Sequence, residues 1–502
     1  MPDSRLKTFL LSLAAGLLAV AGFAPFGFFP LAVFALAVLF VQWLMAANAR
    51  QAAWHGWAFG FGLFGAGTGW IYVALHDYGG MPFLLALPAT ALFCAFLALF
   101  PALAGYAQAK IRAPLWARAT LALPAAWVLA EWLRGMIFTG FPWLAFGYSQ
   151  VTSPLAGYAP LLGVYGVSLL AAASAGLFAW LWFVRWSRPG QMALVALAAL
   201  WIGGVPLRAV EWTQPQGEPL KVSLAQGNIP QELKFQEERL VGTLETYRKL
   251  VERTDARLIV LPETAVPLLR QELPENYAAL LRAHAQKNAG DIIIGAFERE
   301  NGLYYNSVFT LGEAESQHYR KNHLVVFGEF IPLRPLLGWL INDVLNIPMG
   351  DLARGGANQP PLRVAGQKVA VNICYEDVFG EEIIRALPEA TLLVNVSNDA
   401  WYGDSHAAMQ HNQISQMRAL ETGRMMLRAT NTGVTSIIGR NGRILQMLPQ
   451  HEEGELSGMV QGYAGSTPYV RFGNAPAVCA MLLMLVAAWG LASRGRKQGK
   501  PE

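Results

Sequence analysis

The sequence predicts an α/β membrane protein in which a bundle of transmembrane helices carries one large extramembrane domain. Of its 502 residues, 54% are hydrophobic and only 14% are charged, which is too apolar for a typical soluble protein of this size. Stretches without Lys, Arg, Asp or Glu recur before residue 208 and again after residue 471. Between residues 215 and 465 charges are frequent and alternating strand patterns appear. We therefore predict helices 1–7 within residues 1–210, a globular domain over 215–465, helix 8 within 470–493 and a basic tail over 494–502.

The charge-free stretches predict an eight-helix transmembrane bundle, because about 20 apolar residues cross a bilayer. Residues 8–49 are long enough for two spans and are broken at AGFAPFGFFP, where Gly and Pro predict a turn. Residues 136–160 could cross once more, but a ninth span would put Arg185 and Arg188 on the wrong side, so we predict an interfacial loop there. The predicted spans are residues 8–24, 29–47, 54–75, 83–107, 117–134, 160–184, 190–207 and 473–492.

The distribution of basic residues predicts the orientation of these helices. Lys and Arg gather at alternate turns, and the opposite loops, such as HDYGG, nearly lack them. By the positive-inside rule both chain ends are cytoplasmic and the inserted domain is extracytoplasmic. The first 25 residues also resemble a signal peptide, whose cleavage would leave seven spans, but we expect an uncleaved anchor. The basic clusters are Arg5 and Lys7; Arg50; Lys110, Arg112 and Arg118; Arg185 and Arg188; and Arg494, Arg496, Lys497 and Lys500.

One thiol lies outside the apolar stretches. Cys374 is in VNICYEDVFG, whereas Cys94 and Cys479 fall within predicted spans, so the outer domain has no disulfide framework. A buried cysteine can be only a small hydrophobe, and an odd cysteine can pair with another chain. In an oxidising compartment, however, a lone thiol is a liability, which favours a chemical reason for its presence. Two carboxylates, Glu376 and Asp377, follow it closely.

Polar residues follow three short apolar runs that are rich in β-formers. Strand ends commonly offer functional groups, because the sheet fixes the backbone while the loop leaves the side chain accessible. The three runs are RLIVLPETAVP with Glu263, VAVNICYED with Cys374, and TLLVNVSNDAWYG with Asn395, Asn398 and Asp399. A fourth stretch, HYRKNHLVVFGEFIP, carries Lys321 and Glu329.

Glu263, Lys321 and Cys374 together would suffice for acyl transfer. A cysteine nucleophile needs a base for its proton, which a carboxylate can be, and an ammonium can stabilise the developing oxyanion. Taken singly, Glu263 could be a solvated loop carboxylate or a helix cap, and Lys321 a surface lysine. Glu329 and Glu376 could equally pair with nearby basic groups.

Other chemistries have weaker support in the sequence. His323, His406 and His411 allow a rival Cys–His dyad, for which a ring nitrogen would have to reach the sulfur. No HExxH or CxxC pattern occurs, and neither a metal nor another cofactor is predicted. The net charge of +4 is modest and no Lys/Arg stripe has interleaved aromatics, so nucleic acid is not expected as a partner.

LPETA, YRKNHLVVFGE and VNICYED, in this order, resemble the Glu, Lys and Cys motifs of the nitrilase superfamily, the carbon–nitrogen hydrolases. The resemblance implies an α-β-β-α sandwich over residues 220–445 and a Glu263–Lys321–Cys374 triad. It also implies supporting roles for Glu329 and Glu376, which would position Lys321 and the thiol loop, and a backbone amide near Tyr375 that would assist Lys321.

Together with the membrane spans, QGNIPQELKF, FGEFIP, CYEDVFG and SNDAWYGDS resemble the apolipoprotein N-acyltransferases of bacterial envelopes over nearly the whole chain. Phe235 stands where members often have Trp, and Val326 where Pro is common; both remain apolar. The resemblance implies transfer of an sn-1 acyl chain from a phospholipid to the α-amino group of the N-terminal diacylglyceryl-cysteine of an apolipoprotein. The route would be a ping-pong reaction through a thioester, in the bacterial inner membrane, with the catalytic domain on the periplasmic side.

Both substrates would be held in the bilayer, so aromatic and apolar loop residues are expected to form a lipid-facing portal. A membrane-tethered amidase or nitrilase acting on a soluble amide or nitrile would have the same triad and stays as the alternative function. A non-catalytic transport protein would need paired charges inside its spans, which are almost bare of them. The portal candidates, each also explicable as interfacial belt or core residue, are Phe235, Trp401, Tyr402, Trp143 and Met349.

Overall fold

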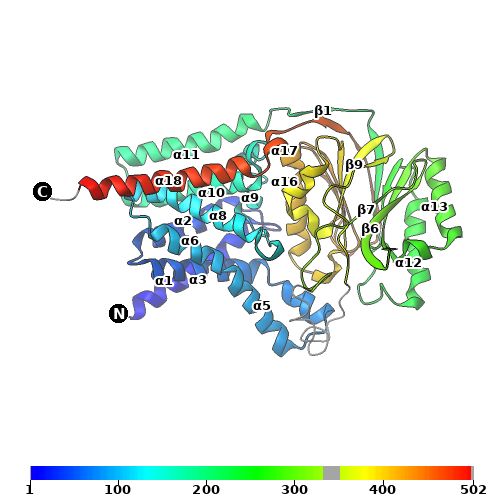
Figure 1. Ribbon diagram of the computed structural model, residues 1–502, viewed down its shortest axis with the longest axis horizontal. Coiled ribbons are helices and arrows are strands. Elements are labelled where there is room, and N and C mark those ends of the chain that lie inside the picture. Colours follow the sequence, from blue (N-terminus) through cyan, green and yellow to red (C-terminus); the bar gives the residue numbers. More distant parts are fainter. Residues whose placement is uncertain (1, 332–350, 499–502) are drawn as a thin grey trace. The chain divides into compact units, whose positions relative to one another are not determined.

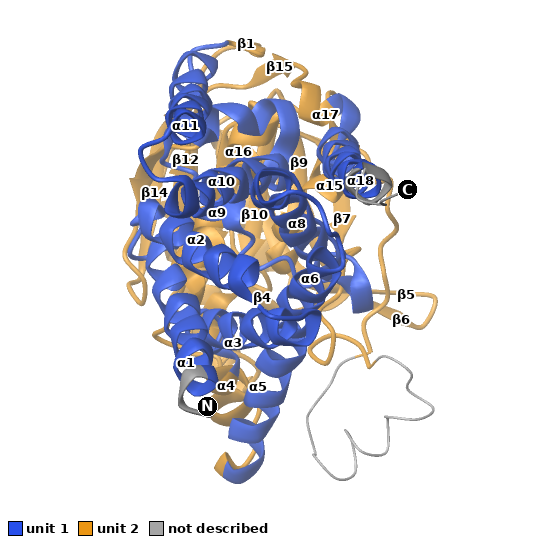
Figure 2. Cartoon of the chain, turned by 90° about the vertical axis from the view of Figure 1, so that its left-hand side faces the viewer, with its two compact units in different colours: residues 1–71, 84–210, 471–502 blue, residues 72–83, 211–470 orange. Residues whose placement is uncertain are grey.

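The computed structural model describes residues 2–331 and 351–498, and the chain divides into two compact units (Figure 2). Unit 1 comprises Met1–Ile71, Leu84–Val210 and Arg471–Glu502. Unit 2 comprises Tyr72–Phe83 and Glu211–Val470. A short piece of the first apolar region therefore belongs to the unit that contains Cys374.

All long elements of unit 1 in the described residues are helices. Its helices are apolar on nearly every side, as expected for helices that face lipid and one another rather than water. Short helical turns, including Val20–Gly22, Arg118–Ala122 and Pro154–Tyr158, join or extend them. The helices are α1 (Pro2–Ala19), α2 (Phe29–Met45), α3 (Ala49–Gly67), α4 (Ile71–Val73, at the boundary), α5 (Phe83–Leu97), α6 (Leu99–Ala109), α7 (Leu115–Ala117), α8 (Leu123–Arg134), α9 (Phe146–Ser149), α10 (Ala159–Val184), α11 (Arg188–Leu207), α17 (Pro468–Phe472, at the boundary) and α18 (Ala475–Gln498).

Five helical segments of the described residues are long and apolar enough to cross a membrane, fewer than the eight predicted spans. They are Arg5–Gly22, Phe83–Ala109, Pro154–Val184, Arg188–Leu207 and Ala475–Arg494. The other three predicted spans are helical but fall short for different reasons. Phe29–Met45 is shorter. The span predicted at 54–75 is a pair of helices bent by 59°, which would make a sixth crossing if it is one span. The span predicted at 117–134 runs without a break through α7, the π-helical turn Arg118–Ala122 and α8, and is not among the segments that are long and apolar enough.

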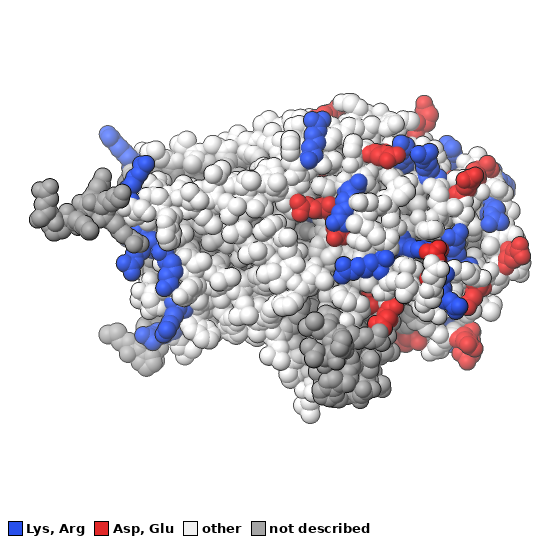
Figure 3. Space-filling model, in the orientation of Figure 1, with Lys and Arg blue, Asp and Glu red and all other residues white. Residues whose placement is uncertain are grey.

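Close approach of backbones holds α1 against α3. A Cβ on Gly16 would lie 2.0 Å from the carbonyl oxygen of Phe59, and one on Gly62 would lie 2.4 Å from that of Leu13, so neither position has space for a side chain. Small residues allow helices in lipid to gain dispersion energy by direct contact. Figure 3 shows Lys and Arg gathered at the end of unit 1 near the chain termini, with the rest of its visible surface nearly free of charge.

Unit 2 is built on two large β-sheets, and β1 and β15 form a further two-stranded sheet (Figure 1). The first sheet has the order β14-β2-β3-β5-β6-β7 with β4 beside β5, and the second has the order β13-β12-β11-β10-β9-β8. Strands β2, β3 and β5 run parallel, as do β9, β10 and β11. The strands are β1 (Thr213–Pro215), β2 (Leu220–Gln226), β3 (Leu258–Val260), β4 (Val266–Leu269), β5 (Asp291–Glu300), β6 (Leu303–Gly312), β7 (His318–Arg320), β8 (Leu362–Val364), β9 (Gln367–Ile373), β10 (Leu392–Ser397), β11 (Met426–Thr430), β12 (Ser436–Ile438), β13 (Ile444–Met447), β14 (Gly454–Val460) and β15 (Tyr463–Gly465).

The alternation of side chains along the strands assigns each face to a layer. In β5, Ile293 points into the core between the two sheets, whereas Ile292 and Ile294 pack under α12 (Glu237–Glu252) and α13 (Glu275–Lys287). On the far side, Leu393 of β10 packs with α15 (Gly380–Ile383) and α16 (Ala407–Thr422). Four layers result, and this confirms the predicted α-β-β-α sandwich.

Candidate active site

The three residues of the predicted triad lie at strand ends of both sheets. Glu263 follows β3 and Lys321 follows β7 in the first sheet, and Cys374 follows β9 in the second. All three side chains are buried, with 6%, 1% and 8% of each residue exposed. Because the carboxyl ends of the parallel strands meet at one edge, the fold brings segments more than a hundred residues apart to one place.

The Lys321 ammonium lies between two carboxylates. Its Nζ is 2.8 Å from Oε1 of Glu329 and 3.5 Å from Oε1 of Glu263. The Asn306 side-chain amide donates to both carboxylates, at 2.7 Å to Glu263 and 3.1 Å to Glu329. Burial lowers the pKa of Lys321, but Glu329, Glu263 and Cys374 outweigh it and hold the pKa above its ordinary value. Lys321 is therefore a permanent cation in the site.

Cys374 has a left-handed backbone, with φ at +53°, which an L-residue adopts only where its surroundings impose it. Burial, and then the charge of Glu263, raise the pKa of the thiol, while Lys321 opposes them. A thiol with a raised pKa can act as a nucleophile only with a base to take its proton. The Glu263 carboxylate is fixed in position, because its Oε2 accepts a hydrogen bond of 2.8 Å from the backbone N–H of Asn398.

Glu376 joins the thiol loop to the segment that follows Lys321. Its Oε1 accepts from the backbone N–H groups of Asn322 at 2.7 Å and His323 at 3.0 Å, and its Oε2 accepts from Ile373 N–H at 2.7 Å. Burial raises the pKa of Glu376. The Glu376 carboxylate thus accepts four hydrogen bonds, the fourth from the Tyr319 hydroxyl at 3.0 Å. A carboxylate engaged in this way suits positioning rather than proton transfer.

The remaining candidates differ in exposure. In unit 2, the Phe235 and Trp401 residues are 56% and 41% exposed, and the Trp401 ring lies 6.4 Å from that of Tyr78, in the segment that unit 2 takes from the apolar region. Tyr402 is half-buried, and burial, followed by Cys374 and Asp399, raises its pKa. Tyr375 is buried with its ring 5.3 Å from Phe379.

The Trp143 side chain lies inside unit 1. It is 1% exposed, with its ring 5.3 Å from Trp70 and 6.2 Å from Phe141. This is core packing, the other explanation that the sequence allowed. Met349 lies outside the described residues.

Lys234 belongs to the site although no sequence pattern singled it out. It is 2% exposed, and its ammonium donates a hydrogen bond of 3.1 Å to the main-chain oxygen of Glu263. Burial lowers the pKa of Lys234 to about 8, with Glu263 and Cys374 opposing the shift. The only sequence feature that points to Lys234 is its position within QGNIPQELKF, because the spacing of residues there does not show that this lysine is buried.

Replacing Lys234 by methionine is expected to remove a pH dependence of stability. The folded pKa of about 8 is below the ordinary 10.5, so between these values the unfolded chain holds a proton that the folded chain has lost. Folding of the wild type therefore becomes more favourable as pH rises. The difference between the free energies of unfolding of wild type and Lys234→Met should change by about 3 kcal/mol in favour of the wild type from pH 7.5 to 10.5.

Denaturant unfolding in detergent micelles, followed by tryptophan fluorescence, measures this difference. The exposed Lys287, on α13, offers the control Lys287→Met, which should show no such trend. A difference between wild type and Lys234→Met that stays constant with pH would contradict the prediction.

Two family models and several curated relatives match the chain. The model described as "Apolipoprotein N-acyltransferase N-terminal domain" matches residues 15–177, and the carbon–nitrogen hydrolase model matches residues 221–469. An apolipoprotein N-acyltransferase of Nitrosomonas europaea is 52% identical over 97% of this chain and 98% of its own. The chain belongs to the apolipoprotein N-acyltransferase family. Two further apolipoprotein N-acyltransferases are similar along nearly the whole chain. The protein of Methylococcus capsulatus is 44% identical over 99% of both chains, and that of Chromobacterium violaceum is 46% identical over 98% of this chain and 96% of its own.

Membership in the apolipoprotein N-acyltransferase family accounts for both parts of the chain. The carbon–nitrogen hydrolase match contains Glu263, Lys321 and Cys374, and the N-terminal match covers most helices of unit 1. The family makes the chain a membrane acyltransferase of lipoprotein biosynthesis, as the motifs predicted. A hydrolase of soluble amides or nitriles is not favoured, because the acyltransferases match along nearly the full length.

Proposed function

We propose that this chain transfers the sn-1 acyl chain of a phospholipid to the α-amino group of the N-terminal diacylglyceryl-cysteine of apolipoproteins, through a thioester at Cys374. The observation that carries the proposal is the buried group formed by Glu263, Lys321 and Glu329, of which Glu263 and Lys321 act electrostatically on the buried Cys374 thiol, in a chain of the apolipoprotein N-acyltransferase family. A base, a fixed cation and a nucleophile are the parts that acyl transfer requires.

In the first half-reaction, Glu263 takes the thiol proton as the Cys374 sulfur attacks the ester carbonyl. The carbonyl oxygen becomes an oxyanion, which the Lys321 ammonium stabilises. The intermediate collapses by breaking the bond to the glycerol oxygen, and that oxygen receives the proton from Glu263. A lysophospholipid leaves, and the acyl chain remains on Cys374 as a thioester.

In the second half-reaction, the α-amine of the lipidated cysteine attacks the thioester carbonyl and gives a proton to Glu263. Collapse breaks the carbon–sulfur bond, and the leaving sulfur recovers that proton. The product is an amide, and the enzyme returns to its starting state. Glu329 and Glu376 position Lys321 and the thiol loop during both steps, through the contacts described above.

The proposed setting is the bacterial inner membrane, with residues 215–465 on the periplasmic side and both chain ends in the cytoplasm. Basic residues at one end of unit 1 support this orientation (Figure 3). Eight crossings, with boundaries at 210 and 470, would need the bent pair, the shorter Phe29–Met45 and α8 to cross as well. Phe235, Trp401, Tyr402 and Met349 remain the proposed lipid contacts, with the exposed rings of Phe235 and Trp401 best suited, whereas Trp143 is packed inside unit 1.

The acceptor identifies the reaction. We expect the purified protein, given phospholipid labelled at sn-1 and a diacylated lipopeptide, to form labelled N-acyl peptide, measured by mass spectrometry. A lipopeptide with an acetylated α-amine should give none, because no amine is left to attack the thioester. Labelled free fatty acid as the sole product, at equal rates with either peptide, would point to hydrolysis and reject the proposal.

A further inference from the structure

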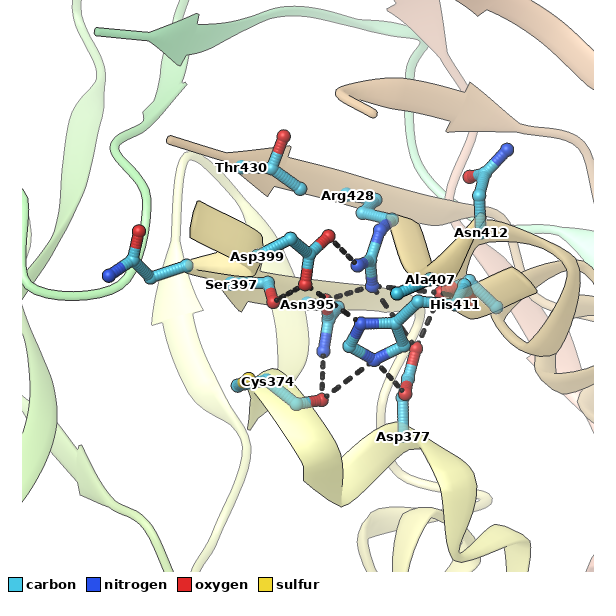
Figure 4. Close-up of polar contacts among 12 residues, drawn as sticks. Cys374, Asp377, Asn395, Ser397, Asp399, Ala407, His411, Asn412, Arg428 and Thr430 are labelled. Carbon is cyan, nitrogen blue, oxygen red and sulfur yellow. Dashed lines mark hydrogen bonds and ion pairs between the residues drawn. The ribbon is translucent and has the colours of Figure 1, made fainter. Parts of the chain in front are cut away.

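Next to the main-chain carbonyl of Cys374 lies a buried polar assembly whose side chains take no direct part in the proposed reaction. His411 of α16, Arg428 of β11, Asp377 and Asp399 meet there, and all four side chains are almost completely excluded from solvent. Figure 4 shows the imidazole of His411 between the two carboxylates, with Arg428 on the side of Asp399. The sequence had raised His411 as a possible partner of the sulfur. The structure instead places its Nε2 at 3.2 Å from the main-chain oxygen of Cys374.

The Cys374 carbonyl has a second donor whose orientation is fixed. The Asn395 side-chain nitrogen lies 3.1 Å from that carbonyl oxygen. Arg428 Nη1 is 2.6 Å from the Asn395 side-chain oxygen, and because a guanidinium can only donate, the amide cannot be turned around. Two donors therefore hold the peptide group of a residue whose backbone is in the left-handed region.

The contacts of His411 determine its protonation. Nδ1 lies 3.0 Å from Oδ1 of Asp399, and Nε2 lies 2.7 Å from Oδ1 of Asp377. Carboxylate oxygens accept hydrogen bonds, so both ring nitrogens carry a proton and the ring is an imidazolium. Burial and Arg428 lower the pKa of His411, but Asp377 and Asp399 outweigh them and hold it above its ordinary value.

The four charges balance. Arg428 donates to Asp399 at 2.8 Å and lies 3.4 Å from Asp377, so two cations face two carboxylates. Removing one member of such a buried group leaves an uncompensated charge, which forces the neighbours to rearrange. A His411 that is already doubly protonated cannot be the base for the thiol.

The assembly is also connected to Glu263, the proposed base. Asp399 begins the short helix Asp399–Tyr402, and the residue before it, Asn398, donates its N–H to Glu263 at 2.8 Å. One loop thus connects Glu263 to the assembly that holds the Cys374 carbonyl.

We propose that His411, Arg428, Asp377 and Asp399 are positioning residues that fix the Cys374 backbone relative to Glu263 for acyl transfer. The inference rests on the proposed thioester at Cys374. Small displacements of reacting groups cost about 10²-fold in rate, so loss of the imidazolium should slow thioester formation without changing which atoms react.

Single-turnover acylation of the full chain by diacyl phosphatidylethanolamine, followed by intact mass, tests the proposal. We expect His411→Gln to lower the rate constant about 10²-fold while the fraction finally acylated and the lipid concentration for half-maximal rate stay near wild type. The matched control is His284→Gln, since His284 contacts the Thr254 carbonyl on the other side of the domain and should not change the rate.

Rate and amplitude separate positioning from folding. A His411→Gln rate constant equal to wild type, with or without a smaller acylated fraction, would overturn the proposal. If that variant does not fold, Ser415→Ala decides, because it removes only a hydroxyl that donates to Asp377 at 2.5 Å. A slowing of about three- to tenfold is expected, and no slowing would again overturn it. Absence of acylation in the wild type would instead reject the thioester itself.

Discussion

Cys374→Ala is expected to abolish both the acyl-enzyme and the N-acyl product, with a loss of at least about 10⁴-fold in kcat. Alanine keeps the β-carbon but has no sulfur, so no atom is left to accept the acyl chain. The wild-type thiol is buried and under the charges of Glu263 and Lys321, and the substitution removes a small side chain while leaving their ion pair in place. Intact mass after mixing with phospholipid measures the result: an added acyl mass in the wild type and none in the variant.

The chain supplies its own control for this experiment. Cys479 is an exposed cysteine on α18 in unit 1, and Cys479→Ala should acylate at the wild-type rate. Equal acyl labelling of Cys374→Ala and wild type would reject Cys374 as the nucleophile. Acyl labelling that is lost in Cys479→Ala would identify Cys479, and not Cys374, as the reactive thiol.

The fold of unit 2 could be predicted because its signals are local. Period-two alternation in stretches such as DIIIGAFERE assigns side chains to opposite faces, and the structure puts Ile293 between the sheets and Ile292 under the helices. The strand-end position of Glu263, Lys321 and Cys374 is equally local. The order of these three residues along the chain, together with the sequence motifs around them, is enough to predict the family.

Burial and pairing across the fold could not be predicted. Lys234 and His411 were visible as residue types, but only the packing shows that one ammonium contacts the Glu263 carbonyl and that one imidazole bridges two carboxylates. The count of eight spans is not confirmed: five described segments are long and apolar enough to cross a membrane, or six with the bent pair. Hydropathy registers composition, whereas a bend such as the one after Gly67 is a feature of the folded chain.

Glu263→Gln is expected to slow thioester formation by about 10²- to 10⁴-fold, the usual contribution of a general base. Glutamine has the same length and can still accept a hydrogen bond, but it cannot take a proton from Cys374. Since burial and Glu263 raise the pKa of the thiol in the wild type, little thiolate forms unaided near neutral pH. The variant must therefore rely on that small fraction, which increases about tenfold per pH unit below the thiol pKa.

The pH profile of acylation therefore distinguishes a base from a structural partner, and Glu329→Gln is the matched control. Glu263 and Glu329 both contact the Lys321 ammonium, at 3.5 Å and 2.8 Å, so each variant removes one carboxylate from the same cation. If Glu263 accepts the proton, the rate of Glu263→Gln should rise steeply from pH 7 to pH 9, whereas Glu329→Gln should be slower than wild type with an unchanged profile. The reverse pattern would make Glu329 the base and Glu263 the residue that holds Lys321 in place.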